Sequence, residues 1–305
     1  MTVDVIIPTY KPDGKFKILM DRLQKQEHEI HQIIILNTKS EQELPEIAEK
    51  PYSVKVIEIK PEDFDHGATR NLGARSSEAD IILFMTQDAV PADRKLVSEF
   101  VKVFEKYQDI NLAYGRQLPN KDCSIIEQYT RKFNYPEQSQ IKSIQDMEKM
   151  GIKTFFFSDV CAAYRRRNFL QRGGFEEPII FSEDMIYAGR CVFDGERIAY
   201  VSEARVFHSH NYTCMQQFHR NFDVAVSQKQ HSELFENISS EGEGIRMVVQ
   251  SAKYLLRIRK PWLIVKLIMQ SGSKYLGYFL GKRYQKLPSK VVLWCTSSKR
   301  YWKNA

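Results

Sequence analysis

Carboxylate and imidazole side chains follow apolar segments at three places in this 305-residue chain. Asp88 comes directly after the apolar run Ile81–Met85, and Glu183 and Asp184 open a helical pattern. A carboxylate at the end of a buried strand can hold a divalent cation, and the cation can hold a diphosphate. A carboxylate at a helix N-terminus stays ionised and can act as a general base. Taken singly, Asp88 is more typical of a solvated loop acid. The acidic pair at the helix start is equally typical of charge that complements the helix dipole.

Two histidines, His208 and His210, follow a short apolar segment late in the chain. They are two residues apart on a segment predicted to be extended, where such side chains point to opposite sides. We therefore expect at most one of them to face a site. That histidine can complete a metal site that Asp88 begins, although a lone histidine is more often a satisfied structural group.

The segment at residues 64–71 reads FDHGATRN and lies between a predicted strand and a predicted helix. Gly67 allows a tight turn, and Thr69 or His66 can cap the helix. Arg70 in the first turn can meet a phosphate or pair with a carboxylate. Alone, the segment is typical of a capped helix with a structural ion pair. Together with Asp88, it predicts the second wall of a nucleotide-sugar pocket, formed by His66, Gly67, Arg70 and Asn71.

The elements that must position these residues alternate between strand and helix patterns. Val- and Ile-rich runs predict strands at 3–8, 32–36, 54–59, 81–85 and 111–116, and helical spacing occupies 16–26, 68–76 and 94–107. Continuous apolar strands that alternate with helices are typical of a sheet buried on both faces. We predict an α/β fold with a Rossmann-like, mostly parallel central sheet flanked by helices, whose nucleotide-binding half is residues 1–118.

Residues 119–235 are predicted to form a second half that faces the ligand and binds an acceptor. The expected elements are a polar helical segment at 122–150, a strand at 154–160, a helix at 185–193 with Ser182 as N-cap, and strands at 197–201 and 205–207. The two halves together make one domain, residues 1–235.

The charge is strongly segregated along the chain. Residues 244–305 contain fourteen Lys/Arg and no Asp/Glu, whereas residues 1–243 contain 31 basic and 38 acidic side chains. We call residues 236–305 the C-terminal tail, and predict basic amphipathic helices broken at Pro261 and around Gly272. Such helices bind anionic membrane surfaces, and the alternative is a helical cap packed on the body with solvated charges. Nucleic acid is disfavoured, because the body is acidic and no recognition motif occurs.

The hydropathy pattern predicts where in the cell the protein is found. The sequence has no stretch of 18 uncharged apolar residues, and its beginning reads as a strand rather than a signal peptide. We expect a cytoplasmic protein that is peripheral on the inner face of the cell membrane.

These motifs together resemble those of the family 2 glycosyltransferases, which have the GT-A fold. The resemblance covers about residues 3–225 and rests on the opening strand Val5-Ile6-Ile7-Pro8-Thr9-Tyr10, on Thr86-Gln87-Asp88 at the position of the family's DxD motif, on Ser182-Glu183-Asp184 at its ED motif, and on His208. The FDHGATRN, TQDA and HSH elements are similar to those of bacterial polysaccharide rhamnosyltransferases that use dTDP-L-rhamnose. The tail is similar in character to that of Gram-positive cell-wall rhamnosyltransferases.

The resemblance implies the roles of several residues. Asp88 would coordinate Mg²⁺ or Mn²⁺ on the donor diphosphate, His208 would complete the metal or phosphate site, and Asp184, next to Glu183, would deprotonate the acceptor hydroxyl. The nucleotide sugar would be lined by Pro8, Thr9, Tyr10, Asn37, Thr38 and Gln87. Two positions depart from the family pattern: Thr86 replaces the first acid of DxD, and Asn37-Thr38 stand where an acidic pair is common. A single carboxylate therefore remains at this strand end.

The resemblance implies an inverting transferase that moves L-rhamnose from dTDP-β-L-rhamnose to a lipid-linked cell-wall or capsular saccharide. One alternative keeps the fold and mechanism but uses UDP-galactose, UDP-glucose or a UDP-N-acetylhexosamine. Another class of function also remains open, a non-catalytic protein whose tail binds membrane or nucleic acid.

Overall fold

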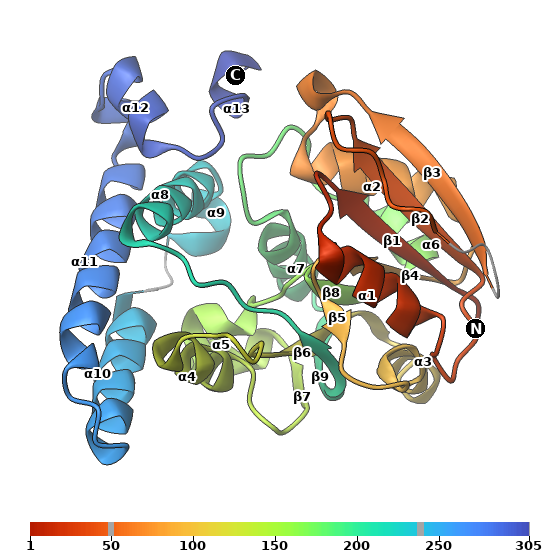
Figure 1. Cartoon of the computed structure of the whole chain (residues 1–305), viewed down its shortest axis with the longest axis horizontal. Helices are drawn as coiled ribbons and strands as arrows, with labels where there is room; N and C mark the ends of the chain where they lie inside the picture. The colour runs from red at the N-terminus through yellow and green to blue at the C-terminus, as the bar shows by residue number, and fades with distance from the viewer. Residues whose placement is uncertain (48–51, 237–240, 305) are drawn as a thin grey trace.

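The computed structural model describes residues 1–47, 52–236 and 241–304 (Figure 1). Its strands are β1 (Val3–Thr9), β2 (Gln32–Thr38), β3 (Ser53–Ile59), β4 (Ile81–Met85), β5 (Val90–Pro91), β6 (Ile110–Leu118), β7 (Gln140–Lys142), β8 (Cys161–Arg165) and β9 (Arg197–Phe207). Its α-helices are α1 (Gly14–Leu23), α2 (His66–Ser76), α3 (Leu96–Lys106), α4 (Ile125–Asn134), α5 (Met147–Met150), α6 (Arg166–Gln171), α7 (Glu183–Phe193), α8 (Cys214–Gln230), α9 (Ser232–Phe235), α10 (Glu241–Arg257), α11 (Leu263–Gly281), α12 (Ser289–Cys295) and α13 (Tyr301–Asn304).

The strands form one sheet in the order β3-β2-β1-β4-β8-β6-β9-β5, and β7 also pairs with β9. The four strands β3, β2, β1 and β4 run parallel, as the sequence predicts. β8 is antiparallel to both β4 and β6, whereas β6 and β9 are parallel. The carboxyl ends of β1, β2, β4, β6 and β9 therefore meet the start of β8 at one edge of the sheet.

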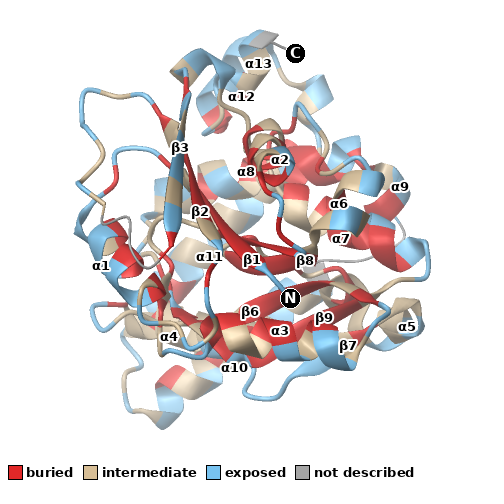
Figure 2. Cartoon of the chain, turned by 90° about the vertical axis from the view of Figure 1, so that its right-hand side faces the viewer, coloured by how far each residue is buried: buried red, intermediate tan, exposed pale blue. Residues whose placement is uncertain are grey.

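Helices cover both faces of the sheet, whose central strands are buried (Figure 2). On one face, α1 and α3 contribute Phe16 and Phe100 to the core. On the other face, Phe169 of α6 and Tyr187 of α7 pack with Phe84 of β4. Burial on both faces explains why these strands read as unbroken apolar runs.

The C-terminal tail is packed on the body through α11, which lies along α8 (Figure 1). Gly277 and Gly281 allow this close approach, because a Cβ atom at either position would meet the carbonyl oxygen of Phe218 or Phe222. α10 and α11 also meet α4, where Ile126, Leu255 and Leu267 are buried. The helical-cap alternative therefore describes part of the tail correctly.

Several expected elements differ from those observed. Residues 154–160 do not form a strand, because a 3₁₀ turn at Gly151–Thr154 leads into irregular chain and the strand begins only at Cys161. The strands expected at 197–201 and 205–207 are one strand, β9, with an irregularity in its pairing with β6. Residues 122–150 contain β7 as well as helices.

The tail also differs from expectation at one of its two predicted breaks. The chain leaves the helix near Pro261, but α11 continues through Gly272, because the helix as a whole packs on α8. The predicted domain boundary at 235/236 falls just after α9, and residues 237–240 lie outside the described part of the chain. Within the described residues, no helix is both long and apolar enough to cross a membrane.

Candidate active site

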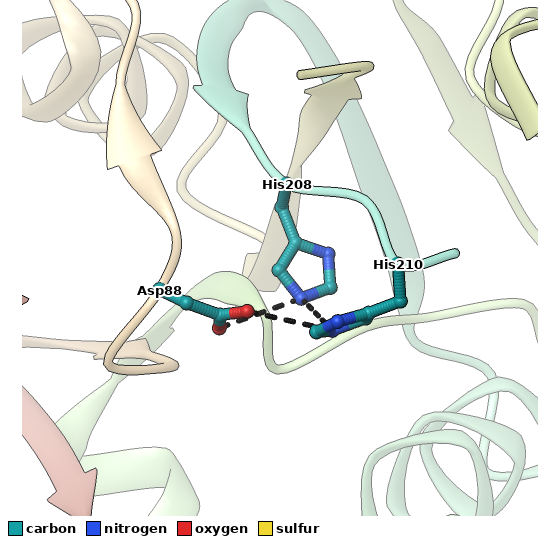
Figure 3. Close-up of side chains that lie close together, drawn as sticks. All are labelled: Asp88, His208 and His210. Carbon is teal, nitrogen blue, oxygen red and sulfur yellow. Dashed lines mark hydrogen bonds and ion pairs between the residues drawn. The ribbon is translucent and has the colours of Figure 1, made fainter. Parts of the chain in front are cut away.

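Asp88, His208 and His210 converge at the carboxyl edge of the sheet (Figure 3). The Asp88 carboxylate lies 3.5 Å from His208 Nε2 and 3.4 Å from His210 Nε2, and the two Nε2 atoms are 3.0 Å apart. One donor atom from each residue lies within 4.8 Å of the others. The expectation that only one histidine faces the site is wrong. β9 ends at Phe207, so the alternation of an extended strand does not apply to the residues that follow.

The histidines have the protonation that metal ligation requires. Burial lowers the pKa of His208 well below its ordinary value and also lowers that of His210, so both rings are neutral at pH 7. His208 Nδ1 lies 3.0 Å from the Gln117 Oε1 acceptor, a contact that places the ring proton on Nδ1 and turns the lone pair of Nε2 toward Asp88 and His210. One carboxylate oxygen and two imidazole nitrogens suit a divalent cation.

Asp184 is held by backbone donors on both of its carboxylate oxygens. The Asp159 N–H donates to Oδ2 at 3.0 Å, and the Met185 N–H donates to Oδ1 at 2.7 Å. Burial, and then the neighbouring Glu183, raise the pKa of Asp184 to about 6. The side chain is therefore oriented and mostly ionised at neutral pH, as a general base should be. Ser182 occupies the N-cap position of α7 as expected, but its side chain makes no capping hydrogen bond.

Glu183 belongs to a buried charge cluster behind Asp184. Arg70 Nη1 lies 3.0 Å from Glu183 Oε1, and Arg70 Nε lies 3.4 Å from Asp159 Oδ2. Burial alone would raise the pKa of Glu183, but Arg70 and then His66 lower it below its ordinary value. The Tyr164 hydroxyl donates to Asp159 at 2.6 Å. One guanidinium therefore serves two carboxylates, and Glu183 is occupied as an ion-pair partner rather than open to a substrate.

Hydrogen bonds connect the histidine cluster to the base. Gln117 accepts from His208, and its amide donates to the Ser158 hydroxyl at 3.0 Å. Ser158 precedes Asp159, whose backbone N–H holds Asp184. The segment 158–160 also pairs with the strand end before Asp88, because the Thr86 N–H donates to the Val160 carbonyl. The two halves of the site are thus built on one continuous scaffold.

The residues expected at the nucleotide lie together at the ends of β1, β2 and β4. The Thr9 hydroxyl donates to Asn37 Oδ1 at 3.0 Å. Gln87 clamps the backbone of Tyr10, accepting from its N–H at 2.8 Å and donating to its carbonyl at 3.1 Å. Pro8 precedes them in β1, and within the described residues the buried Thr38 hydroxyl has no hydrogen-bond partner. These side chains border one surface beside Asp88, and their contacts with a nucleotide stay a prediction.

The FDHGATRN segment holds the chain before α7 instead of forming an open pocket wall. Asp65, not Thr69 or His66, caps α2 by accepting from the Ala68 N–H, and its other oxygen accepts from the Ile179 N–H. Asn71 is buried and exchanges hydrogen bonds with the backbone of Phe175.

The other residues of the FDHGATRN segment also contact protein atoms. Gly67 is buried because the carbonyl of Glu176 fills the space that a Cβ atom would need. Arg70 pairs with carboxylates, the second of the two options that the sequence leaves open. His66 is partly buried, and burial lowers the pKa of its ring although the nearby Glu183 opposes the shift. Protein atoms thus contact the polar groups of Arg70 and Asn71 and fill the space beside Gly67, and the contacts of these residues with a nucleotide sugar stay a prediction.

Three residues that the sequence does not single out belong to this site. Asp159 and Gln117 supply the links described above, and their neighbours in the sequence, Val160 and Leu118, give no sign of this. Arg220 of α8 contacts the rings of Phe181 and Tyr212. Burial is the main cause of the low pKa of His208, and the charge of Arg220 lowers that pKa further. Within the described residues Arg220 forms no ion pair, which leaves its charge available to an anion.

Residues 4–173 match the family described as Glycosyl transferase family 2, over more than half of the chain. The chain belongs to this family. It is therefore a glycosyltransferase, with a candidate base and candidate metal ligands at the carboxyl edge of its sheet.

Two relatives match over almost their entire lengths. The O-antigen chain rhamnosyltransferase RfbN of Salmonella typhimurium is 37% identical over 306 residues, with 100% of this chain and 97% of the relative covered. The O-antigen chain rhamnosyltransferase WbaN of Salmonella anatum is 37% identical over 303 residues, with 98% of this chain and 95% of the relative covered.

Solved structures of glycosyltransferases share the fold. The mannosyltransferase PcManGT of Pyrobaculum calidifontis, in complex with GDP-Man and Mn²⁺, aligns with a TM-score of 0.56 at 13% identity and covers 99% of this chain and 83% of that one. TarS 1–349 of S. aureus, in complex with UDP-GlcNAc, aligns with a TM-score of 0.54 at 12% identity and covers 94% and 92%. The predicted GT-A architecture is confirmed.

Proposed function

We propose that this family 2 glycosyltransferase transfers L-rhamnose from dTDP-β-L-rhamnose to a hydroxyl of a lipid-linked polysaccharide precursor, with inversion at the anomeric carbon. The observation that carries the proposal is the full-length 37% identity to two O-antigen rhamnosyltransferases. The site supports it, because a positioned carboxylate and a cluster of candidate metal ligands lie on one scaffold.

In the proposed reaction, Asp184 accepts the proton of the acceptor hydroxyl. The hydroxyl oxygen forms a bond to C1 of rhamnose while the bond from C1 to the phosphate oxygen breaks, and dTDP leaves with the electron pair. Attack on the side opposite the leaving group inverts the anomeric centre. The two backbone N–H groups on Asp184 keep its carboxylate aimed at one position, which is how orientation lowers the barrier.

Asp88, His208 and His210 would hold the divalent cation. When bound, the cation would offset the charge that develops on the departing diphosphate. Two imidazoles and a single carboxylate favour Mn²⁺ over Mg²⁺, because Mg²⁺ prefers an all-oxygen set. Arg220 would contact the same diphosphate, and Thr9, Tyr10, Asn37 and Thr38 would face the nucleoside beside Gln87.

We also propose that the protein docks on the cytoplasmic face of an anionic membrane through α11. The side of α11 away from α8 exposes a stripe of apolar residues: Val265, Ile268, Met269, Tyr275, Leu276 and Phe279. Basic residues border the stripe, with Arg283 lying over the ring of Phe279 at 3.7 Å. An exposed apolar stripe bordered by basic residues is typical of helices that lie in a membrane interface.

Turnover with a panel of nucleotide sugars tests the donor assignment. The purified protein, supplied with Mn²⁺ and a lipid-diphosphate-linked saccharide, should release dTDP and form a rhamnosylated product. UDP-galactose, UDP-glucose and UDP-N-acetylhexosamines should give little product. Transfer from a UDP-hexose with none from dTDP-rhamnose would reject the assignment while leaving the family membership intact.

A further inference from the structure

A pocket of about 320 Å³ opens beside His210, on the side of the candidate metal site that faces the C-terminal tail. Its walls come from α4 and the residues just before it, from the segment between β9 and α8, from the first turn of α8, and from α11. Two acids, Asp122 and Glu127, are among the lining residues. His210 and Tyr212, whose rings stack at 4.9 Å, form the wall next to the candidate metal site. The tail therefore contributes directly to a cavity at the active site.

The wall from α11 is cationic. Lys266, Gln270 and Lys274 are spaced four residues apart and so lie on successive turns of one helix face, and all three line the pocket. Within the described residues neither lysine forms an ion pair. The nearby carboxylate of Glu127 favours the charged form of Lys274, but it is already paired with Arg131 at 2.6 Å.

Lys274 is unusually placed for a charged group without an ion pair. Burial lowers the pKa of its amine, because the charged form has lost part of its hydration. An anion in the pocket would restore the favourable interactions that Lys274 lacks.

We propose that Lys266 and Lys274 bind the diphosphate group of the lipid-linked acceptor, so that this pocket is the acceptor's entry subsite. The inference rests on the proposed function for the identity of the acceptor. Gln217, Gln270 and Thr130 offer amide and hydroxyl groups in the same pocket that suit saccharide hydroxyls.

The position of the pocket favours the acceptor over the donor as the source of this diphosphate. The donor's nucleoside is expected at the ends of β1 and β2, on the other side of Asp88 from α11. By contrast, the two lysines lie on the face of α11 that packs near α8. The exposed apolar stripe lies on the opposite face of the same helix. A lipid-linked group that reaches the site from the membrane would pass along this helix.

Binding of farnesyl diphosphate to the full-length protein tests the inference, with farnesol as the neutral control ligand. EDTA is present, so that a metal at Asp88 cannot contribute. The double variant Lys266→Gln/Lys274→Gln is compared with Lys253→Gln/Lys290→Gln, which removes the same charge from exposed positions of the tail. We expect at least about tenfold weaker binding of farnesyl diphosphate in the first double variant, less than about twofold weakening in the second, and no change for farnesol.

Three results would overturn the inference. Unchanged affinity in the first double variant would show that the pocket does not bind the anion. An equal loss in both double variants would show a general charge effect of the tail. A tenfold loss of dTDP affinity, measured with Mn²⁺, would assign the lysines to the donor's diphosphate. Because no transfer is measured, these outcomes are distinct from a failure of the donor assignment.

Discussion

Asp184 combines two properties that oppose each other in most carboxylates: its oxygens accept two backbone hydrogen bonds, and its pKa is nevertheless raised to about 6. The backbone donors favour the ionised form, but burial and the negative charge of Glu183 outweigh them. A base with this pKa is ionised at neutral pH and still holds a proton well enough to take one from a hydroxyl.

The pH dependence of transfer should follow this group. The rate requires ionised Asp184, so kcat/KM should rise with pH through about 6 and fall by about tenfold per unit below it. Asp184→Asn should lower kcat by about 10²- to 10⁴-fold with little change in donor affinity. The checks are rate profiles between pH 5 and 8 and dTDP binding. If the asparagine variant kept the same pH step, Asp184 would not be its source.

The histidine cluster predicts a second residue-level outcome. EDTA should abolish transfer, and Mn²⁺ should restore it at lower concentration than Mg²⁺. His210→Ala should raise the Mn²⁺ concentration for half-maximal rate by about 10- to 100-fold, because it removes one of three clustered donors. His28→Ala serves as the control, because His28 lies between α1 and β2 and its ring contacts the backbone of Met1. Equal Mn²⁺ requirements in the two variants would argue against His210 as a ligand.

At the level of elements, the packing of α8 against α11 fixes the tail on the catalytic domain. The contact depends on backbone-to-backbone approach at Gly277 and Gly281, so any side chain there must separate the helices. Removing the tail to test its function would uncover Phe218 and Phe222 of α8, so substitutions are the safer experiment.

Gly277→Leu and Gly272→Ala form a matched pair for this contact. The first should destabilise the protein by about 1–3 kcal/mol or more, because the new side chain overlaps the carbonyl of Phe218. The second is in open space within the same helix and should stabilise it by about 0.4–1 kcal/mol. Thermal unfolding of both variants gives the answer. Similar melting temperatures would mean that α11 does not depend on close approach to α8.

The sequence predicts the first half of the fold well, because buried parallel strands such as β4 read as unbroken apolar runs. It fails at 154–160, where the aromatic run Phe155–Phe157 imitates a strand but fills the core from an irregular segment. Strand periodicity also misplaces His210, since the chain leaves the strand just before His208. Asp159 and Gln117 could not be found from sequence, because their roles depend on partners distant in the chain.

The candidate site, like the fold, is predicted in part from local sequence patterns. Asp88, Asp184 and His208 stand next to recognisable strand or helix patterns, so the sequence singles them out as candidates. The FDHGATRN segment is recognisable too. However, it holds the chain before α7 through contacts with residues 174–183, and residue spacing alone does not reveal these contacts.

At the scale of the whole molecule, the exposed apolar stripe and the basic charge are both in the C-terminal tail. The exposed large apolar side chains include thirteen between Ile245 and Trp294, among them Trp262 at 64% exposure. The acidic body projects away from this face (Figure 1). This asymmetry would orient the protein on an anionic bilayer.

Substituting the stripe should weaken membrane binding without changing the catalytic site. We expect Ile268→Asp/Met269→Asp to lower sedimentation with anionic liposomes by about tenfold or more, because it places two charges in the interface. Val56→Asp adds a charge at an exposed site on the β3 edge and should have no effect. Transfer to a short, soluble acceptor should be unchanged in all variants. Undiminished sedimentation of the double variant would reject α11 as the docking helix.

The position of α11, with its apolar stripe on one side and the active-site pocket on another, also sets a minimum length for the acceptor. If the stripe rests on the lipid, the pocket lies about one helix diameter, ~10 Å, above the membrane surface. With the acceptor's diphosphate in that pocket, the lipid has to cover this height, and the saccharide has to span the distance from Lys266 and Lys274 to Asp184 before its terminal hydroxyl meets the carboxylate. One helix would thus act as a ruler that fixes the lipid-linked end of the acceptor and admits saccharides above a threshold length.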